Sequence, residues 1–172
     1  MIKELKRTAH RVRGFTLIEL LVVIGILAVL LAIVLIAVNP PRQFILARNT
    51  QRRSDALAIL NGVGQYFAEN GTLPANIATG SAQAIKSSPL GDVAGDICGR
   101  LSGEGIVGPD QSYLAQIPVD PLPNSGFEYT DCTNYDSGYT IEKSSNNRVT
   151  VTAPNSEDPD GGPNGPTISV TR

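Results

Sequence analysis

The sequence predicts an α+β protein in which a long N-terminal α-helix packs against a small antiparallel β-sheet head. Three observations predict this class. An apolar run of helical length fills residues 15–38, the expected membrane-spanning half of the helix, and a helical pattern continues through residues 39–70 as its amphipathic half. Residues 71–172 are rich in glycine and proline and contain short alternating segments, which are typical of a loop-rich β head. A basic segment, residues 1–14, precedes the helix.

Charge is distributed unevenly along the chain, although the formal net charge is only −2. Residues 1–14 contain five Lys and Arg against one acid, whereas five bases face fourteen acids after Arg53. An acidic head argues against general nucleic-acid binding, because such binding depends on Lys and Arg that neutralise phosphates.

The apolar run at residues 15–38 is long enough to cross a membrane. As a helix it rises about 36 Å, and the hydrocarbon core of a bilayer is about 30 Å thick. Glu19 is the ionisable residue in this run. A carboxylate on an apolar helix costs free energy and is usually functional. The alternative is that Glu19, one turn into the run, reaches the polar interface of the membrane.

The amphipathic half begins with a proline. Pro40 lacks a backbone donor and clashes with the preceding turn, so the helix either kinks or restarts there. Residues 48–55 are polar on all sides and suit solvent or a protein interface, and Asn70-Gly71 predicts the end of the helix. The apolar stripe expected to cover the sheet consists of Leu57, Leu60, Val63, Gly64 and Phe67.

The head contains four alternating segments that predict strands, at residues 127–129, 139–141, 149–151 and 168–170. Residues 144–147 predict a hairpin turn, and residues 75–100 predict a loop or short helix. Cys98 and Cys132 form an even pair, which predicts one disulfide if the head is exported. Two free thiols in a reducing compartment are the alternative.

The start of the apolar run carries a specific motif. Residues 13–20, RGFTLIEL, closely resemble the cleavage and methylation segment of type IV prepilins and of type II secretion pseudopilins. The resemblance combines a basic leader, Gly14 before the cleaved bond, Phe15 after it, Glu19 and a long apolar helix. It continues less strictly at residues 52–55 and 70–74, over roughly the first 75 residues. In the head, residues 117–121 resemble a segment that precedes the sheet in pseudopilins.

The resemblance implies a processing step and an assembly contact. A prepilin peptidase would cut between Gly14 and Phe15 and methylate the new amine of Phe15. Glu19 would then pair with the Phe15 amine of a neighbouring subunit. Pairing of two opposite charges away from water favours one arrangement, because a misplaced neighbour leaves a buried carboxylate without a partner.

The resemblance also implies a function. The chain would be a structural subunit of a type IV pilus-like or type II secretion pseudopilus filament, and not an enzyme. Its partners would be other copies of itself and related minor pilins, the prepilin peptidase, membrane lipid before assembly, and an inner-membrane assembly platform with a separate ATPase. It would sit in the bacterial inner membrane as a single-pass protein with an extracytoplasmic head, then in a cell-surface or periplasmic filament.

Another class of function fits the same organisation. A single-pass, membrane-anchored extracytoplasmic binding or sensor domain that does not polymerise would also have an apolar helix and an exported head. A cleaved leader and filament formation would separate the pilin class from this alternative.

Chemistry-bearing side chains are few. The single histidine, His10, would leave with the leader, so the mature chain would lack the commonest general base, and no catalytic residue is predicted. Asp158 and Asp160 partly resemble the start of a calcium loop, with Thr167 where a bidentate Glu is expected. A solvated turn is the alternative. No cofactor other than this possible Ca²⁺ is expected.

Overall fold

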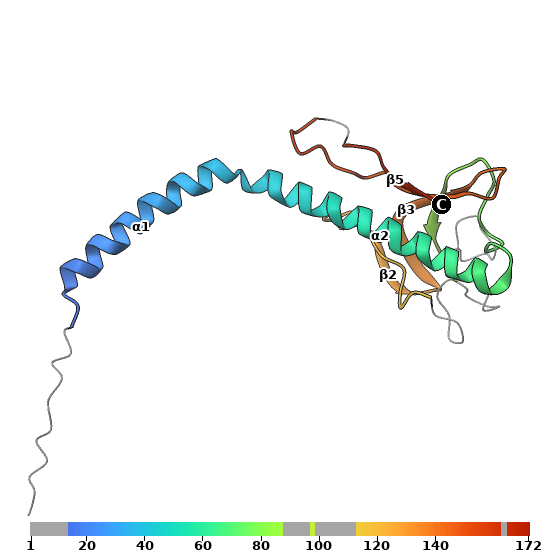
Figure 1. The fold of residues 1–172 in the computed structure, drawn as a ribbon, viewed down its shortest axis with the longest axis horizontal. Coiled ribbons are helices and arrows are strands. Elements are labelled where there is room, and N and C mark those ends of the chain that lie inside the picture. Colours follow the sequence, from blue (N-terminus) through green and yellow to red (C-terminus); the bar gives the residue numbers. More distant parts are fainter. Residues whose placement is uncertain (1–13, 88–96, 99–112, 163–164) are drawn as a thin grey trace, which may run out of the picture. The chain divides into compact units, whose positions relative to one another are not determined.

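The computed structural model describes residues 14–87, 97–98, 113–162 and 165–172 and confirms the α+β class. It divides into two compact units, Met1–Pro40 and Pro41–Arg172, which are considered separately. Figure 1 shows the elements of the described residues in chain order, which are α1 (Leu17–Val38), α2 (Pro40–Asn70), β1 (Gln83–Lys86), β2 (Glu128–Asp131), β3 (Asn134–Lys143), β4 (Val149–Ala153) and β5 (Ile168–Thr171).

Helix α1 has a complete N-terminal cap and a defined end. Thr16 is the N-cap, and Asn39 closes the helix in the left-handed conformation with φ 48°. Helix α2 starts directly afterwards at Pro40, so the chain restarts a helix there. None of the residues of α1, all of which are described, is buried within the chain. This 22-residue apolar helix is long enough to cross a bilayer.

Helix α2 ends where the sequence predicts. Its last residue is Asn70, and Gly71 follows with φ 70°, a conformation that glycine adopts without steric cost. The predicted apolar stripe is correct at Leu60 and Val63. It is wrong at Leu57 and Phe67, which are both 46% exposed. The residues of α2 that face the head are Asn49, Arg52, Ala56, Ile59, Leu60, Gly62, Val63 and Tyr66.

The sheet of the described residues is antiparallel and has the order β1-β3-β4-β5, with β2 also paired to β3. Strands β3, β4 and β5 contain three of the segments predicted from their alternation, and β2 contains the fourth except for Phe127, which precedes the strand. The expectation of a loop or short helix at residues 75–100 is wrong for Gln83–Lys86, which forms β1. This strand has one buried side chain, Ile85, and so carries little apolar alternation.

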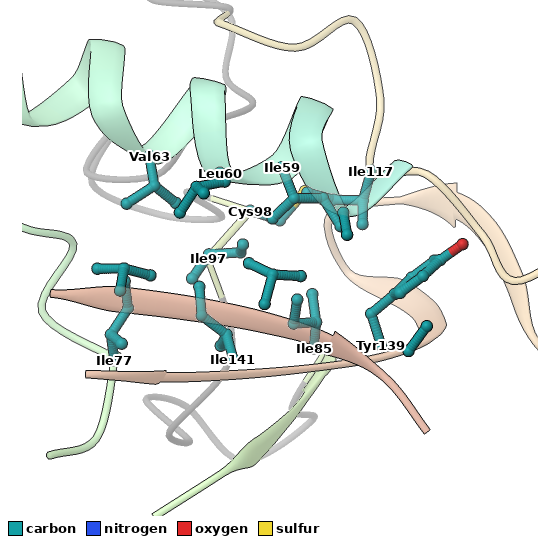
Figure 2. Close-up of a cluster of buried hydrophobic side chains, with 14 of the residues drawn as sticks. Ile59, Leu60, Val63, Ile77, Ile85, Ile97, Cys98, Ile117, Tyr139 and Ile141 are labelled. Carbon is teal, nitrogen blue, oxygen red and sulfur yellow. The ribbon is translucent and has the colours of Figure 1, made fainter. Parts of the chain in front are cut away.

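The core of the head lies between α2 and the sheet. Figure 2 shows Ile59, Leu60 and Val63 pointing from α2 toward Ile85 and Ile141 of the sheet. Ile59, Ile85 and Ile141 are completely buried. Fully burying side chains of this size contributes about 1.5–3 kcal/mol each to folding.

A disulfide joins Cys98 to Cys132, as the cysteine pair predicts. Cys98 belongs to the buried core, and Cys132 lies at the turn between β2 and β3. The bridge closes a loop with a sequence separation of 34 residues. Closing a loop of this size restricts the unfolded chain and stabilises the fold by about 3–4 kcal/mol in the chain-entropy account.

Strand β3 contains a position that requires glycine. Gly138 has φ 73°, and a Cβ there would lie 2.7 Å from Cδ2 of Phe127 and 2.9 Å from Cβ of Asp120. The carbonyl oxygen of Gly138 accepts a hydrogen bond from Nδ2 of Asn155, and that of Ser137 accepts one from the backbone N–H of Asp120. Two loops from outside the strands therefore meet β3 at this point.

We expect Gly138→Ala to destabilise the head more than Gly80→Ala. Both glycines have positive φ, but among the described residues no atom lies within 4 Å of a Cβ built on Gly80. The change at Gly80 should cost about 1–2 kcal/mol from backbone strain alone. The crowding at Gly138 should add about 1–3 kcal/mol. Urea unfolding of the detergent-solubilised chain would measure both, and equal costs would contradict the crowded arrangement.

Candidate functional site

The segment predicted to be cut is accessible in the structure. Gly14 and Phe15 precede α1 and are exposed, and no atom of the described residues lies within 4 Å of a Cβ built on Gly14. The rest of the predicted leader lies outside the described residues. Within the part of the chain that the structure describes, nothing covers the bond between Gly14 and Phe15.

Glu19 is held by the start of its own helix. Its Oε2 accepts hydrogen bonds from the backbone N–H of Thr16 at 2.8 Å and from Oγ1 of Thr16 at 2.7 Å. In return, the backbone N–H of Glu19 donates to Oγ1 of Thr16 at 3.2 Å. These contacts form a capping box, which satisfies donors that the helix itself leaves unpaired. The carboxylate thus has polar partners within its own helix.

A second polar site lies inside the head, where Arg52 and Asp120 form a fully buried ion pair. Nε of Arg52 donates to Oδ2 of Asp120 at 3.0 Å, and Nη2 donates to Oδ1 at 2.9 Å. This two-bond geometry is the strongest arrangement of guanidinium and carboxylate. Oδ1 of Asp120 also accepts from the backbone N–H of Leu122 at 2.9 Å.

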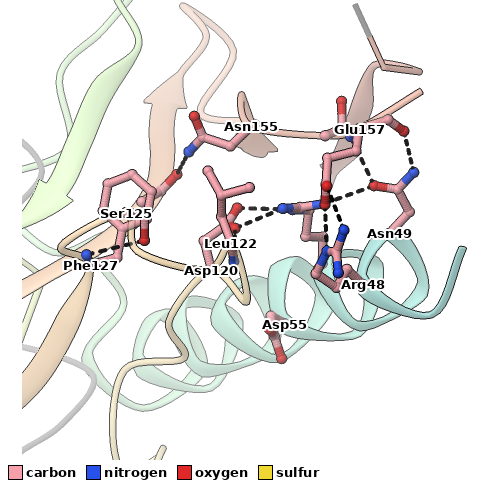
Figure 3. A network of polar contacts seen from close by, with 12 residues as sticks. Arg48, Asn49, Asp55, Asp120, Leu122, Ser125, Phe127, Asn155 and Glu157 are labelled. Atoms are coloured by element: carbon pink, nitrogen blue, oxygen red, sulfur yellow. Dashed lines mark hydrogen bonds and ion pairs between the residues drawn. The ribbon is translucent and has the colours of Figure 1, made fainter. Parts of the chain in front are cut away.

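The loop between β4 and β5 joins this pair through Glu157 (Figure 3). Arg48 donates to both carboxylate oxygens of Glu157 at 2.6 Å, and Nη1 of Arg52 donates to Oε2 at 3.1 Å. Asn49 binds the backbone of Glu157, because its Nδ2 donates to the carbonyl at 2.7 Å and its Oδ1 accepts from the N–H at 3.1 Å. We call these five residues, Arg48, Asn49, Arg52, Asp120 and Glu157, the ion-pair network.

Ionisable groups in and beside the ion-pair network have shifted pKa values. Hydrogen bonds from Arg48 and Arg52 hold the pKa of Glu157 below its usual value. Nearby, the hydroxyl of Tyr139 donates to Oδ2 of Asp55 at 2.9 Å, and burial raises the pKa of both groups. No buried side-chain N or O atom of the described residues lacks a hydrogen-bond partner. The buried polar atoms that the structure describes at this site therefore all have partners within the chain.

The expectation that residues 48–55 face solvent or another protein is wrong for Asn49 and Arg52, which are buried against the head. Their positions continue the helical period of the buried face that includes Ala56 and Ile59. This spacing along the helix is the signal in the sequence that could have predicted their burial. The partner Asp120 is 68 residues away in the chain, and no local pattern identifies it.

The predicted calcium ligands have other partners in the structure. Asp158 accepts hydrogen bonds from the backbone N–H groups of Asp160 and Gly162 at 2.9 and 3.0 Å. Asp160 forms an ion pair with Arg42 at 3.3 Å. Within the described residues, no group of three or more His, Cys, Asp or Glu side chains is placed to hold a metal ion. A calcium site here stays a prediction.

Comparison with known protein families gives one match. Residues 9–35 match the prokaryotic N-terminal methylation motif. No curated protein and no solved structure matches the chain. The N-terminal region is therefore the prepilin-type cleavage and methylation segment of type IV pilins and pseudopilins, here joined to a pilin-like α+β architecture. The motif supports a type IV pilin-like or pseudopilin subunit, implies processing by a prepilin peptidase, and points to a structural role.

We expect Arg52→Met to be far more destabilising than Arg53→Met. Loss of Arg52 leaves the buried carboxylate of Asp120 without its counter-charge, which costs about 3–5 kcal/mol. Arg53 is exposed and forms no ion pair with the described residues, so its replacement should change the free energy of unfolding by about 0.5 kcal/mol or less. Denaturant unfolding of the two variants measures the difference, and similar values would contradict a buried pair.

We expect Glu157→Gln to reduce the acid sensitivity of the head. The pKa of Glu157 is lowered by folding, so its ionised form stabilises the head above its usual value of 4.5, and this contribution disappears as the pH falls through the folded-state pKa. Asp55 acts in the opposite direction because its pKa is raised by burial. Urea midpoints measured from neutral pH into the acid range would show a flatter profile for Glu157→Gln than for the parent chain, and an equally steep profile would contradict the prediction.

Proposed function

We propose that this chain is a structural subunit of a type IV pilus-like or type II secretion pseudopilus filament, assembled through α1. The observation that carries the proposal is an apolar helix with the methylation motif at its start and no buried residue along its length. Such a surface is covered by lipid before assembly and by identical helices afterwards. The head, with its own core and disulfide, faces outward from the filament.

Processing would generate the charge that assembly needs. A prepilin peptidase cuts after Gly14, and the amine of Phe15 becomes a cation about one helical turn from Glu19. Before assembly, Thr16 supplies polar partners for the Glu19 carboxylate in the membrane. In the filament, the methylated Phe15 amine of a neighbouring copy supplies the counter-charge. The pair selects one register between helices, while desolvation offsets much of its attraction.

Transfer of α1 from lipid to a helix bundle changes its apolar surroundings little, so helix packing and the charge pair decide whether subunits associate. The work of extraction comes from a separate ATPase on an inner-membrane assembly platform. Related minor pilins are further partners. The chain is a single-pass inner-membrane protein with an extracytoplasmic head until it enters the filament.

Mass spectrometry of the protein from its native cell tests the processing step. We expect the mature chain to lack residues 1–14 and to carry one added methyl group on Phe15. An intact leader, in cells that contain the processing enzyme, would instead support a membrane-anchored binding or sensor domain.

The assembly step is tested by two changes at Glu19. Glu19→Ala removes the carboxylate, whereas Glu19→Gln keeps an oxygen that can accept from Thr16 and removes only the charge. We expect both variants to insert into the membrane and to form no filaments visible by electron microscopy. The control Glu128→Gln, on an exposed residue of β2, should assemble normally. Filaments from Glu19→Gln would exclude the charge pair as the assembly contact.

A further inference from the structure

Four arginines follow α1 within fifteen residues, and the head neutralises three of them to different degrees. Arg52 and Asp120 have no exposed side-chain area. The Arg48 and Glu157 side chains are 25% and 23% exposed, and the Arg42 and Asp160 side chains are 49% and 76% exposed. The ion pairs therefore become more accessible to solvent toward the end of α2 that adjoins the apolar helix.

The pair of Arg42 and Asp160 is the weakest of the three by geometry. It has a single contact of 3.3 Å between Nη2 of Arg42 and Oδ1 of Asp160, whereas Arg48 makes two bonds of 2.6 Å to Glu157. Exposed pairs of this kind contribute little, because water and salt screen the charges. Another anion near Arg42 can therefore replace Asp160.

Chain length alone keeps Arg42 close to the membrane. Arg42 lies four positions after Val38, the last residue of α1, so their Cα atoms are at most about 14 Å apart whatever the orientation of the head. An arginine side chain at that distance reaches the headgroup layer of a bilayer that α1 crosses. Anionic lipids attract such a residue with a free energy similar to that of an exposed ion pair.

We propose that Arg42 binds the phosphate of anionic lipid headgroups and that Asp160, on the loop between β4 and β5, competes for it within the chain. This inference rests on the proposed membrane insertion of α1. Glu157 stays bound to Arg48, Asn49 and Arg52, so an exchange at Arg42 releases only the part of the loop around Asp160. The anionic membrane surface thereby acts on one loop of the head and leaves the ion-pair network in place.

The experiment uses the full chain in vesicles, with a fluorescent probe beside Arg42. The chain contains no tryptophan, so Phe44→Trp introduces a single reporter at a side chain that is 65% exposed. Vesicles contain phosphatidylcholine alone or mixed with phosphatidylglycerol, and brominated phosphatidylcholine quenches tryptophan that approaches the bilayer. Flotation of the vesicles first establishes insertion, so failure to insert would reject the proposed anchoring itself.

We expect Asp160→Asn to raise the quenching constant roughly two- to fivefold in vesicles that contain phosphatidylglycerol and to leave it unchanged in phosphatidylcholine. The double variant Arg42→Gln/Asp160→Asn distinguishes two causes of increased quenching. Binding of lipid to Arg42 requires the arginine, whereas loss of repulsion between Asp160 and the lipid does not. Quenching should return to the parent value in the double variant, and Glu128→Gln should match the parent.

Three results would overturn the proposal for an inserted chain. One is unchanged quenching in Asp160→Asn with phosphatidylglycerol. The second is an increase that persists without Arg42, which would assign the effect to repulsion between Asp160 and the lipid. The third is an equal change when inorganic phosphate is added to phosphatidylcholine vesicles, which would make the site one for free phosphate.

Discussion

The buried ion pair of Arg52 and Asp120 is the constraint on which the arrangement of the head depends. Apolar burial attracts α2 to the sheet but does not specify one position, because the hydrophobic effect has no direction. A buried guanidinium does specify one, since its donors must meet acceptors at fixed angles. The same contact holds the loop before β2, and Glu157 adds the loop before β5. Gly138 then provides the space in β3 where Asp120 and Phe127 approach the strand.

The head and helix α1 differ in how far their side chains are buried and hydrogen-bonded within the chain. In the described part of the head, every buried side-chain N or O atom has a hydrogen-bond partner, and the apolar side chains form one core. Helix α1 buries none of its residues within the chain, and its Glu19 forms hydrogen bonds with the N-cap residue Thr16. The residues that determine the fold of the head are therefore separate from those available for association.

Sequence reasoning predicted what local pattern determines. The apolar run marks α1, the left-handed Gly71 marks the end of α2, and alternation marks four strands. The cysteines offered only one possible pairing within the chain. Strand β1 was missed because Ile85 is its single buried side chain. The position of Arg52 was misjudged because a charged residue in a polar segment suggests solvent, and its partner Asp120 is brought to it only by the tertiary fold.

The order of the three ion pairs along α2 has a mechanical consequence. In the filament proposed above, tension would enter each head from α1 at the first turn of α2 and would reach Arg42 before Arg48 and Arg52. The contacts that are loaded first are the most exposed and the easiest to reform, and the one that is loaded last is the buried pair. A pulled subunit would therefore yield at its outer contact and recover, while the sheet and core behind Arg52 stay unstrained.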